Sequence, residues 1–165
     1  MYQVNLQRNY LTNVDEIISL AEEHSDLFSE RSEGKSYNFR TQYGSSKLKS
    51  LFNFNMNDSL KAAIVKTIPD DPRFITSMTI NRYDPGDYLL RHKDSIGGYW
   101  KFKLIFLRSD KPHFKYYDEQ GIGHLVEEEP GALIDMPIHI EHEVTEITAD
   151  ERPKYSLVLA WGRIA

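Results

Sequence analysis

Residues 81–94 read NRYDPGDYLLRHKD, in which a strand-like run ends at Tyr83, a Pro-Gly turn follows, and an apolar pair leads to His92 and Asp94. Side chains two residues apart on a strand point to the same side. The imidazole of His92 and the carboxylate of Asp94 are therefore expected to project together. Nitrogen and oxygen ligands placed in this way can both reach one metal ion, at about 2 Å from each. The pair predicts two ligands of a metal site.

A third ligand must come from another strand, and the histidines further along the chain are His113, His124, His139 and His142. His142 opens the segment HEVTEI, in which Val144 alternates with polar neighbours as in a strand. Only a chain that doubles back can bring it to Asp94, as an antiparallel barrel does. Two histidines and one carboxylate with open positions are the ligand set of non-haem Fe(II) oxygenases. We interpret the other three histidines as ordinary or solvent-facing residues.

After Pro72 the chain consists of short segments rich in β-branched and aromatic residues, separated by Gly, Pro, Asp and Asn. They are FITSMTINRY (74–83), YWKFKLIFL (99–107), HFKYYD (113–118), GHLVEE (123–128), GALIDMPI (131–138), HEVTEIT (142–148) and KYSLVLAWGRI (154–164). Roughly seven or eight short strands with tight connections predict an all-β sandwich or barrel. The second segment alternates, with one side formed by Phe102, Leu104 and Phe106 and the other by Lys101, Lys103, Ile105 and Leu107.

Two helices are predicted before these strands. TNVDEIISLAEEH has apolar residues at helical spacing, with Thr12 or Asn13 as its N-cap. MNDSLKAAIVKTIP has a second apolar stripe, with Asn57 or Asp58 as its N-cap. We expect both helices to cover one face of the β structure.

We expect one domain over residues 1–165, with a helical support region at 1–72 and a β-barrel core at 73–165. The polar segment 29–47 is predicted to be a loop. The run EEE at 127–129 is interpreted as a solvated turn before Pro-Gly.

The composition restricts the chemistry. The 165 residues include no cysteine, so disulfides and thiolate ligands are excluded, and a metal must be held by His, Asp or Glu. The net charge of −5 and the isoelectric point near 5.7 argue against indiscriminate binding to nucleic acid or anionic membranes, although they are compatible with a local basic groove. The chain starts without the apolar core of a signal peptide, and no stretch approaches membrane-spanning length. We therefore expect a soluble, cytoplasmic protein.

Two blocks of the sequence resemble a known superfamily. The first block follows the pattern Tyr-x-Pro-Gly-Asp-aromatic-Leu-x-x-His-x-Asp, at Tyr83, Pro85, Gly86, Asp87, Tyr88, Leu89, His92 and Asp94. The second block combines Pro-Gly, an apolar strand, His-x-Val and basic-x-Ser, at Pro130, Gly131, ALIDMPI, His142, Val144 and KYSLVLAW. In order, type and spacing, residues 81–161 resemble the 2-oxoglutarate- and Fe(II)-dependent dioxygenases, especially their prolyl 4-hydroxylase-like branch.

The resemblance implies a mainly β fold, a double-stranded β-helix or jelly roll with supporting N-terminal helices. It implies that His92, Asp94 and His142 hold Fe(II), and that the co-substrate 2-oxoglutarate chelates this iron. The far carboxylate of the co-substrate would meet a basic side chain deep in the barrel, with Tyr83 lending its hydroxyl. A buried carboxylate needs such partners, because burying it without them is costly.

Two residues compete for the role of this basic side chain. Lys154 with Ser156 reproduces the basic-x-Ser spacing, and Pro153 disfavours a regular strand before Lys154. Arg152 stands at about the family's usual distance from the distal histidine. We favour Lys154, keep Arg152 as the alternative, and regard Lys103 as a lesser candidate.

The same resemblance implies an oxygenase that uses O2 and 2-oxoglutarate to hydroxylate a C–H bond and releases succinate and CO2, with ascorbate as a candidate reductant. A prolyl or other peptidyl side chain is the favoured substrate. Candidates to frame the mouth of the site are Tyr88, Arg91 and Tyr99, with Tyr37, Arg40 and Tyr43 in the polar loop. Nucleic-acid demethylases of the superfamily fit less well, because their second arginine lies closer to the basic position than Arg163 does here.

Two other function classes stay open. A cupin-like barrel, such as an isomerase or a binding module, would use the metal without oxidative chemistry. It explains the three ligands but not Tyr83 or the basic-x-Ser spacing. A barrel without metal would act as a binding or structural module.

Overall fold

The structure is a computed structural model that describes residues 4–32, 40–94, 99–137 and 139–162. Within these residues the chain is mainly β, with thirteen strands and two α-helices, α1 (Val14–Glu23) and α2 (Asp58–Val65). Short 3-10 helices cover Ser25–Leu27, Asn53–Asn55 and Pro72–Phe74. Neither α-helix has the length and apolar character that crossing a membrane requires.

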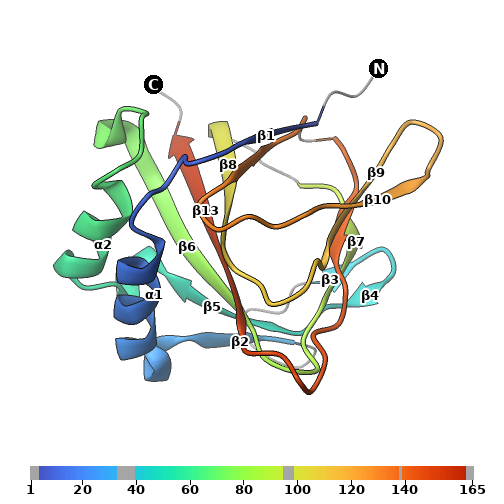
Figure 1. The fold of residues 1–165 in the computed structure, drawn as a ribbon, viewed down its shortest axis with the longest axis horizontal. Helices are drawn as coiled ribbons and strands as arrows, with labels where there is room; N and C mark the ends of the chain where they lie inside the picture. Colours follow the sequence, from blue (N-terminus) through green and yellow to red (C-terminus); the bar gives the residue numbers. More distant parts are fainter. Residues whose placement is uncertain (1–3, 33–39, 95–98, 138, 163–165) are drawn as a thin grey trace.

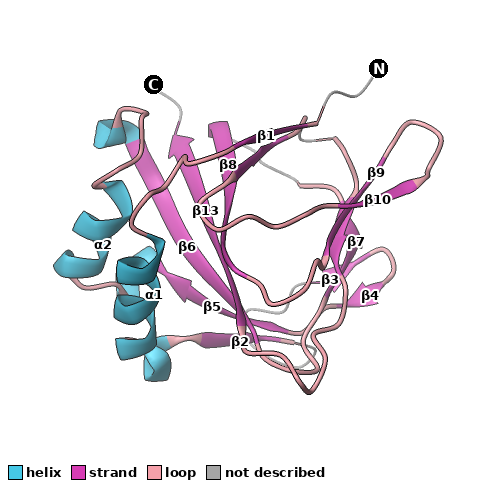
Figure 2. Ribbon diagram, viewed as in Figure 1, coloured by secondary structure: helices cyan, strands magenta, loops and turns pink. Residues whose placement is uncertain are grey.

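Two antiparallel sheets contain all the strands of the described residues except β3 and β4 (Figures 1 and 2). The larger sheet has seven strands in the order β1 (Asn5–Gln7), β11 (Leu133–Asp135), β8 (Tyr99–Arg108), β13 (Lys154–Gly162), β6 (Ile75–Tyr83), β5 (Leu48–Phe52) and β2 (Ser29–Arg31). The smaller sheet has the order β10 (Gly123–Leu125), β9 (Phe114–Tyr117), β12 (His142–Val144) and β7 (Leu89–His92). A separate hairpin joins β3 (Arg40–Thr41) to β4 (Gly44–Ser45). The mainly β class with antiparallel pairing agrees with the prediction.

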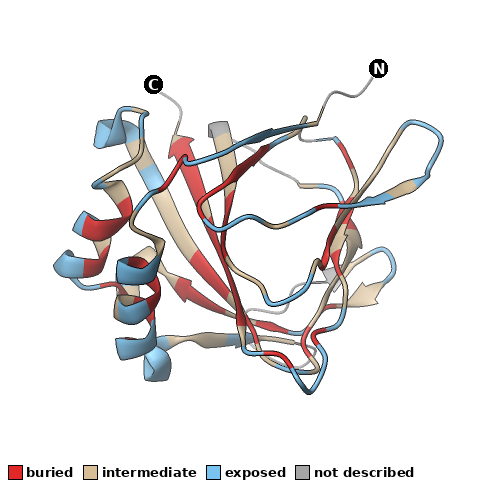
Figure 3. Cartoon of the chain, in the orientation of Figure 1, coloured by how far each residue is buried: buried red, intermediate tan, exposed pale blue. Residues whose placement is uncertain are grey.

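Both helices pack on one face of the larger sheet, as predicted (Figure 2). Their buried faces, Ile17, Ile18 and Ala21 on α1 and Leu60, Ala63 and Ile64 on α2, join one core with Ile80, Ile105, Leu157 and Leu159 of the sheet. Figure 3 shows the resulting pattern, in which the buried side of each helix turns toward the strands. The helices therefore shield one face of the sheet and leave the other face to the smaller sheet.

Asn13 and Asn57, both predicted as possible N-caps, occupy the N-cap positions of α1 and α2. Asn57 caps α2, because its side-chain oxygen accepts a hydrogen bond from the backbone N–H of Leu60 at 2.9 Å. Asn13 precedes α1, but its side-chain amide donates instead to the carbonyl of Ala63 at 2.8 Å. Asn13 thus ties the two helices together rather than capping its own.

The alternation predicted on β8 is present in the structure. Ile105 and Leu107 belong to the core beneath the helices. Phe106 and, at its edge, Leu104 belong to a second core that includes Phe114 and Val144 of the smaller sheet. The larger sheet therefore has one face against the helices and one face toward the interior between the sheets.

Strands in the first 72 residues were not predicted. β1, β2 and β5 all join the larger sheet, and β3 and β4 lie in the segment expected to be a loop. β5 has the sequence LKSLF, in which the adjacent Lys49 and Ser50 break the alternation of apolar and polar residues. Its pairing with β6 and the contacts of Lys49 with the neighbouring turn explain the strand.

The Pro-Gly turn of the opening motif is held by β5. The ammonium of Lys49 lies 2.9 Å from the carboxylate of Asp84 and 2.8 Å from that of Asp87. The buried Asp87 carboxylate also accepts a hydrogen bond from the backbone N–H of Asp84 at 2.9 Å. Gly86 adopts φ 91°, a left-handed conformation that glycine tolerates best. The turn therefore fixes where β7, and with it His92, begins.

Candidate metal centre and cavity

Two histidines face each other across neighbouring strands of the smaller sheet. His92 ends β7, His142 begins β12, and the two are direct partners in the antiparallel register. Their ring centroids lie 4.3 Å apart, and both side chains are nearly buried. Close contact of this kind is expected for opposite residues on paired strands.

Asp94 completes the cluster just after β7 ends. One of its carboxylate oxygens lies 3.5 Å from Nε2 of His92 and 3.5 Å from Nε2 of His142. The potential ligand atoms of all three residues lie within 4.8 Å of one another. The structure thus brings together the three residues that the sequence singled out.

The protonation of both imidazoles follows from their backbone contacts. Nδ1 of His92 lies 2.7 Å from the carbonyl oxygen of Leu90, and Nδ1 of His142 lies 3.1 Å from that of Ile140. A carbonyl oxygen only accepts, so each Nδ1 carries the proton and donates it. In this tautomer the lone pair of the imidazole is on Nε2, and both Nε2 atoms face Asp94.

Burial keeps His142 neutral. Burial lowers its pKa, the nearby His92 lowers it further, and the carboxylate of Asp94 opposes both effects. The ring of Phe114 stacks on that of His142 at 5.5 Å between centroids and fixes its plane. A neutral, oriented imidazole is the form that binds a metal.

The cluster lines a cavity of about 790 Å³ between the two sheets. The wall formed by the larger sheet is polar toward one end of its strands, with Asn81 and Tyr83 on β6 and Lys154 and Ser156 on β13. Tyr83 pairs in register with Lys154, and Asn81 with Ser156. The cavity therefore contains the predicted metal ligands together with Tyr83, Lys154 and Ser156.

Lys154 is the basic candidate that faces this cavity. Its side chain is 2% exposed, and Nζ lies 5.3 Å from the centre of the Phe106 ring. Burial lowers the pKa of Lys154, so its cationic form depends on a nearby negative charge. Glu128 supplies that charge through a direct ion pair with the ammonium. The wall of the cavity thus holds a lysine that is already paired.

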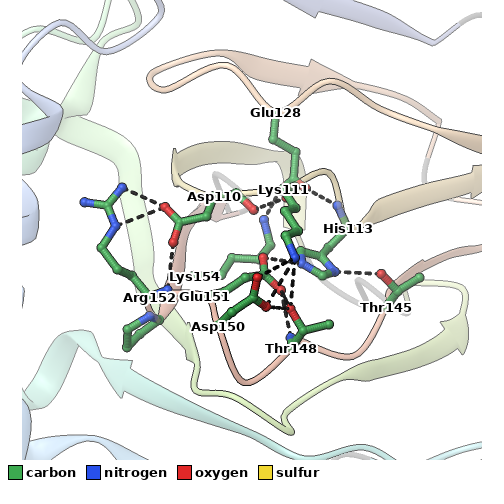
Figure 4. A network of polar contacts seen from close by, with 12 residues as sticks. Asp110, Lys111, His113, Glu128, Thr145, Thr148, Asp150, Glu151, Arg152 and Lys154 are labelled. Atoms are coloured by element: carbon green, nitrogen blue, oxygen red, sulfur yellow. Dashed lines mark hydrogen bonds and ion pairs between the residues drawn. The ribbon is translucent and has the colours of Figure 1, made fainter.

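Glu128 is buried, although the sequence indicated a solvated turn. Its side chain is 1% exposed. The second carboxylate oxygen accepts hydrogen bonds from the backbone N–H groups of His113 and Phe114 at 2.5 and 3.1 Å. Figure 4 shows Glu128 between Lys154 and the backbone at His113. Both oxygens of this carboxylate are therefore in use.

The other two basic candidates lie outside the cavity. Arg152 is 64% exposed and donates to Asp110, with Nη2 2.7 Å from Oδ1. Lys103 points to the helical side of the sheet, where its ammonium lies 3.3 Å from Asp70. The structure therefore does not bring either residue to the polar wall, and the choice of Lys154 over both remains.

Tyr83 and a second cation extend the polar wall. Burial raises the pKa of Tyr83, so its phenol stays protonated and can donate a hydrogen bond. Arg31 on β2 also lines the cavity and donates to Ser50 at 3.4 Å, while Ser50 donates to Asn81 at 2.7 Å. Arg31 was missed because it lies in the segment predicted to be a loop.

Of the residues proposed to frame the mouth of the cavity, some lie next to it and others do not. The guanidinium of Arg91 lies 3.7 Å from the ring centre of Tyr117 and donates to Glu141, a cavity residue, at 2.7 Å. The exposed Tyr43 lies 5.9 Å from the same guanidinium. Tyr88 pairs through its backbone with Lys47 and does not line the cavity. The side chains of Tyr37, Arg40 and Tyr99 lie outside the described residues.

The remaining histidines are not part of the cluster among the described residues. His139 is exposed, and His124 lies 2.8 Å from Asp118 at the surface. His113 is instead buried, with Nε2 2.7 Å from Glu151 and Nδ1 2.7 Å from Thr145 (Figure 4). This buried pair ties the segment before β13 to β9, which the sequence pattern did not indicate.

Comparison with known proteins places the fold. No protein-family model and no curated protein sequence matches the chain. Its structure is similar to a Pseudomonas putida prolyl-4-hydroxylase, with a TM-score of 0.62, 17% identity, and coverage of 99% of this chain and 94% of that one. It is also similar to a Trichoplax adhaerens prolyl hydroxylase, solved with a hypoxia-inducible factor peptide, with a TM-score of 0.63, 15% identity, and coverage of 96% and 83%.

A third similar structure is the non-haem α-ketoglutarate-dependent carbocyclase SnoK of nogalamycin biosynthesis, with a TM-score of 0.68, 12% identity, and coverage of 96% and 79%. These identities are low, so the likeness concerns the arrangement of the chain. The chain therefore has the fold of the 2-oxoglutarate- and Fe(II)-dependent oxygenases, the superfamily that residues 81–161 resemble in sequence.

Proposed function

We propose that this chain is a 2-oxoglutarate- and Fe(II)-dependent dioxygenase that hydroxylates a C–H bond and releases succinate and CO2. One observation carries this function: the Nε2 atoms of His92 and His142 and the carboxylate of Asp94 converge beside a cavity that also holds Lys154 and Ser156. We take the chain over residues 1–165 to be one such domain, with the β strands forming a double-stranded β-helix.

The donor set suits Fe(II). Two imidazoles whose Nδ1 atoms face backbone carbonyls, and one carboxylate, form the two-histidine, one-carboxylate set of non-haem iron oxygenases. His92, Asp94 and His142 would hold the ion, which when bound supplies the activation of O2. The carbonyls of Leu90 and Ile140 would keep both rings in the ligating tautomer.

The polar wall would bind 2-oxoglutarate. Lys154, Ser156 and Tyr83 offer an ammonium and two hydroxyls from adjacent strands, which suits a carboxylate. Phe106 and Leu104, on the adjacent strand β8 of the same sheet, also line the cavity and would exclude water from the co-substrate. O2 as second co-substrate and ascorbate as reductant rest on the sequence resemblance alone.

A peptidyl side chain is the proposed substrate class. The resemblance to the prolyl 4-hydroxylase-like branch supports it, as does the peptide bound to the Trichoplax adhaerens enzyme of the same fold. On this chain, Arg91, Tyr117 and Tyr43 form a cationic and aromatic surface next to Glu141, which lines the cavity. Such a surface would orient an extended chain over the cavity.

The test uses the purified protein with Fe(II) and 2-oxoglutarate under anaerobic conditions. A metal-to-ligand charge-transfer absorption should appear, and O2 should then release succinate. His92→Ala and Asp94→Ala should lose both signals. Succinate release that persists unchanged in either variant would contradict the proposed function.

A second function is favoured by one observation. Lys154 is already paired with Glu128, so its charge is not fully available to a co-substrate carboxylate. A cupin-like barrel that binds metal without 2-oxoglutarate chemistry would need no such charge. Binding of metal without any binding of 2-oxoglutarate would favour this second function.

A further inference from the structure

We infer that Glu128 is a specificity-determining residue of the co-substrate site, where its carboxylate competes with the distal carboxylate of 2-oxoglutarate for Lys154. This inference rests on the function proposed above. Glu128 is not among the residues that line the cavity, whereas its partner Lys154 is.

The Glu128 carboxylate is held in place by contacts at both of its oxygens. One oxygen contacts the ammonium of Lys154, and the other accepts from the backbone N–H groups of His113 and Phe114. If the carboxylate swung away, two buried N–H groups would lose their acceptor, and each such loss is unfavourable. Glu128 is therefore expected to remain beside Lys154 when a ligand enters.

The two carboxylates compete because the ion pair of Lys154 and Glu128 offers only one positive charge. The polar side chains drawn beside the pair have partners of their own: His113 with Glu151, Arg152 with Asp110, and Lys111 with Asp150 (Figure 4). Lys154 and Glu128 together are neutral, with both side chains almost fully buried. A second carboxylate on Lys154 would give this pair two buried negative charges for one positive charge, which is unfavourable. Arg31, the other cation that lines the cavity, is outside this pair and is tested by its own variant. The site should therefore gain little from the distal carboxylate while Glu128 is charged.

The test compares two ligands on the Mn(II)-loaded protein by calorimetric titration. 2-Oxoglutarate has the distal carboxylate, and 2-oxobutyrate has the same metal-binding end without it. In the unaltered protein the two affinities should differ by less than about ten-fold. Glu128→Gln and Glu128→Ala should bind 2-oxoglutarate about ten-fold or more tightly than the unaltered protein. Their affinity for 2-oxobutyrate should not change.

The matched control is Glu127→Gln, which removes the same charge from the exposed neighbour in the acidic run and should leave both affinities unchanged. Equal or weaker binding of 2-oxoglutarate by both Glu128 variants overturns the inference. So does a loss of binding in Arg31→Gln alone, because the distal carboxylate would then lie at the other cation of the cavity. If every variant and the unaltered protein hold Mn(II) but none binds 2-oxoglutarate, the proposed function itself fails.

Discussion

His92 and His142 are direct partners across β7 and β12, with ring centroids 4.3 Å apart, although they lie far apart along the chain. The pairing of these strands therefore builds the candidate metal centre, and Asp94 needs only the two residues after β7 to reach it. Each ring contacts a backbone carbonyl through Nδ1, and the ring of Phe114 also stacks on that of His142. The geometry of the site thus depends on the strand register.

Removal of any one of the three ligands should abolish tight metal binding. We expect His142→Ala or Asp94→Ala to lower the affinity for Mn(II) by more than about a hundred-fold, since even residues that only orient ligands change metal affinity by about 10–100-fold. Paramagnetic resonance of free Mn(II) measures this directly. His139→Ala is the control, because that residue is exposed and outside the cluster. Equal losses in the control and the ligand variants would contradict the assignment.

The metal-free protein should become less stable in mild acid. Burial, with His92, lowers the pKa of His142 in the folded state, whereas the unfolded chain has an ordinary histidine pKa near 6.5. As the pH falls through about 6.5, the unfolded chain binds a proton at this histidine before the folded chain does. The stability that neutral His142 contributes is complete above that pH and is lost as the pH falls toward the pKa of the folded state. Urea unfolding of chelator-treated protein at about pH 7.5 and about pH 5.5 measures the loss.

His142→Gln should show a smaller loss between the two pH values, because the depressed titration is gone. His139→Gln should behave like the unaltered protein, since this exposed residue is outside the cluster. An identical pH dependence in all three proteins would mean that His142 does not set it.

The features that could be predicted from the sequence are those that depend on residues close together along the chain. The strands after Pro72 and both helices follow from alternation, helical spacing and caps, and the ligands follow from His-x-Asp and the strand that starts at His142. β5 could not be predicted in this way, because LKSLF is short and its second residue, Lys49, looks solvent-facing. Its strand conformation comes from pairing with β6 and from the two aspartates of the turn, which are distant in sequence.

The burial of Glu128 could not be predicted for a similar reason. Three consecutive glutamates look alike, yet Glu127 and Glu129 are exposed while the side chain of Glu128 is 1% exposed. The difference is made by Lys154 and by the backbone N–H groups at the start of β9, none of which is near in sequence. Charge pairs of this kind are visible only once the sheets are assembled.

Lys154 and Glu128 should depend on each other for stability. We expect Lys154→Met to lower the free energy of unfolding by about 3–5 kcal/mol, because it leaves a buried carboxylate without its cation. The double variant Lys154→Met with Glu128→Gln should recover most of this loss, because the amide removes the uncompensated charge and its oxygen can still accept from the backbone N–H groups of His113 and Phe114. Urea denaturation measures both. Arg152→Met, at an exposed ion pair, should change little.

If the double variant is as unstable as Lys154→Met alone, the two side chains do not act as a buried pair. The stability of the single variant then reflects lost packing against Phe106, which lies 5.3 Å from the ammonium.

Arg91 should contribute to the use of a peptide substrate. Its guanidinium lies over Tyr117 and is bonded to Glu141, so its removal would both unstack the aromatic surface and free a carboxylate at the cavity. We expect Arg91→Ala to reduce peptide-stimulated succinate release by about ten-fold, equivalent to about 1.4 kcal/mol of substrate binding in the transition state. The measurement is succinate release across a panel of proline-containing peptides.

Arg73→Ala is the matched control, because Arg73 is 78% exposed and pairs with Asp71 outside the cavity. Equal stimulation in Arg91→Ala and the control would show that the peptide does not use this surface.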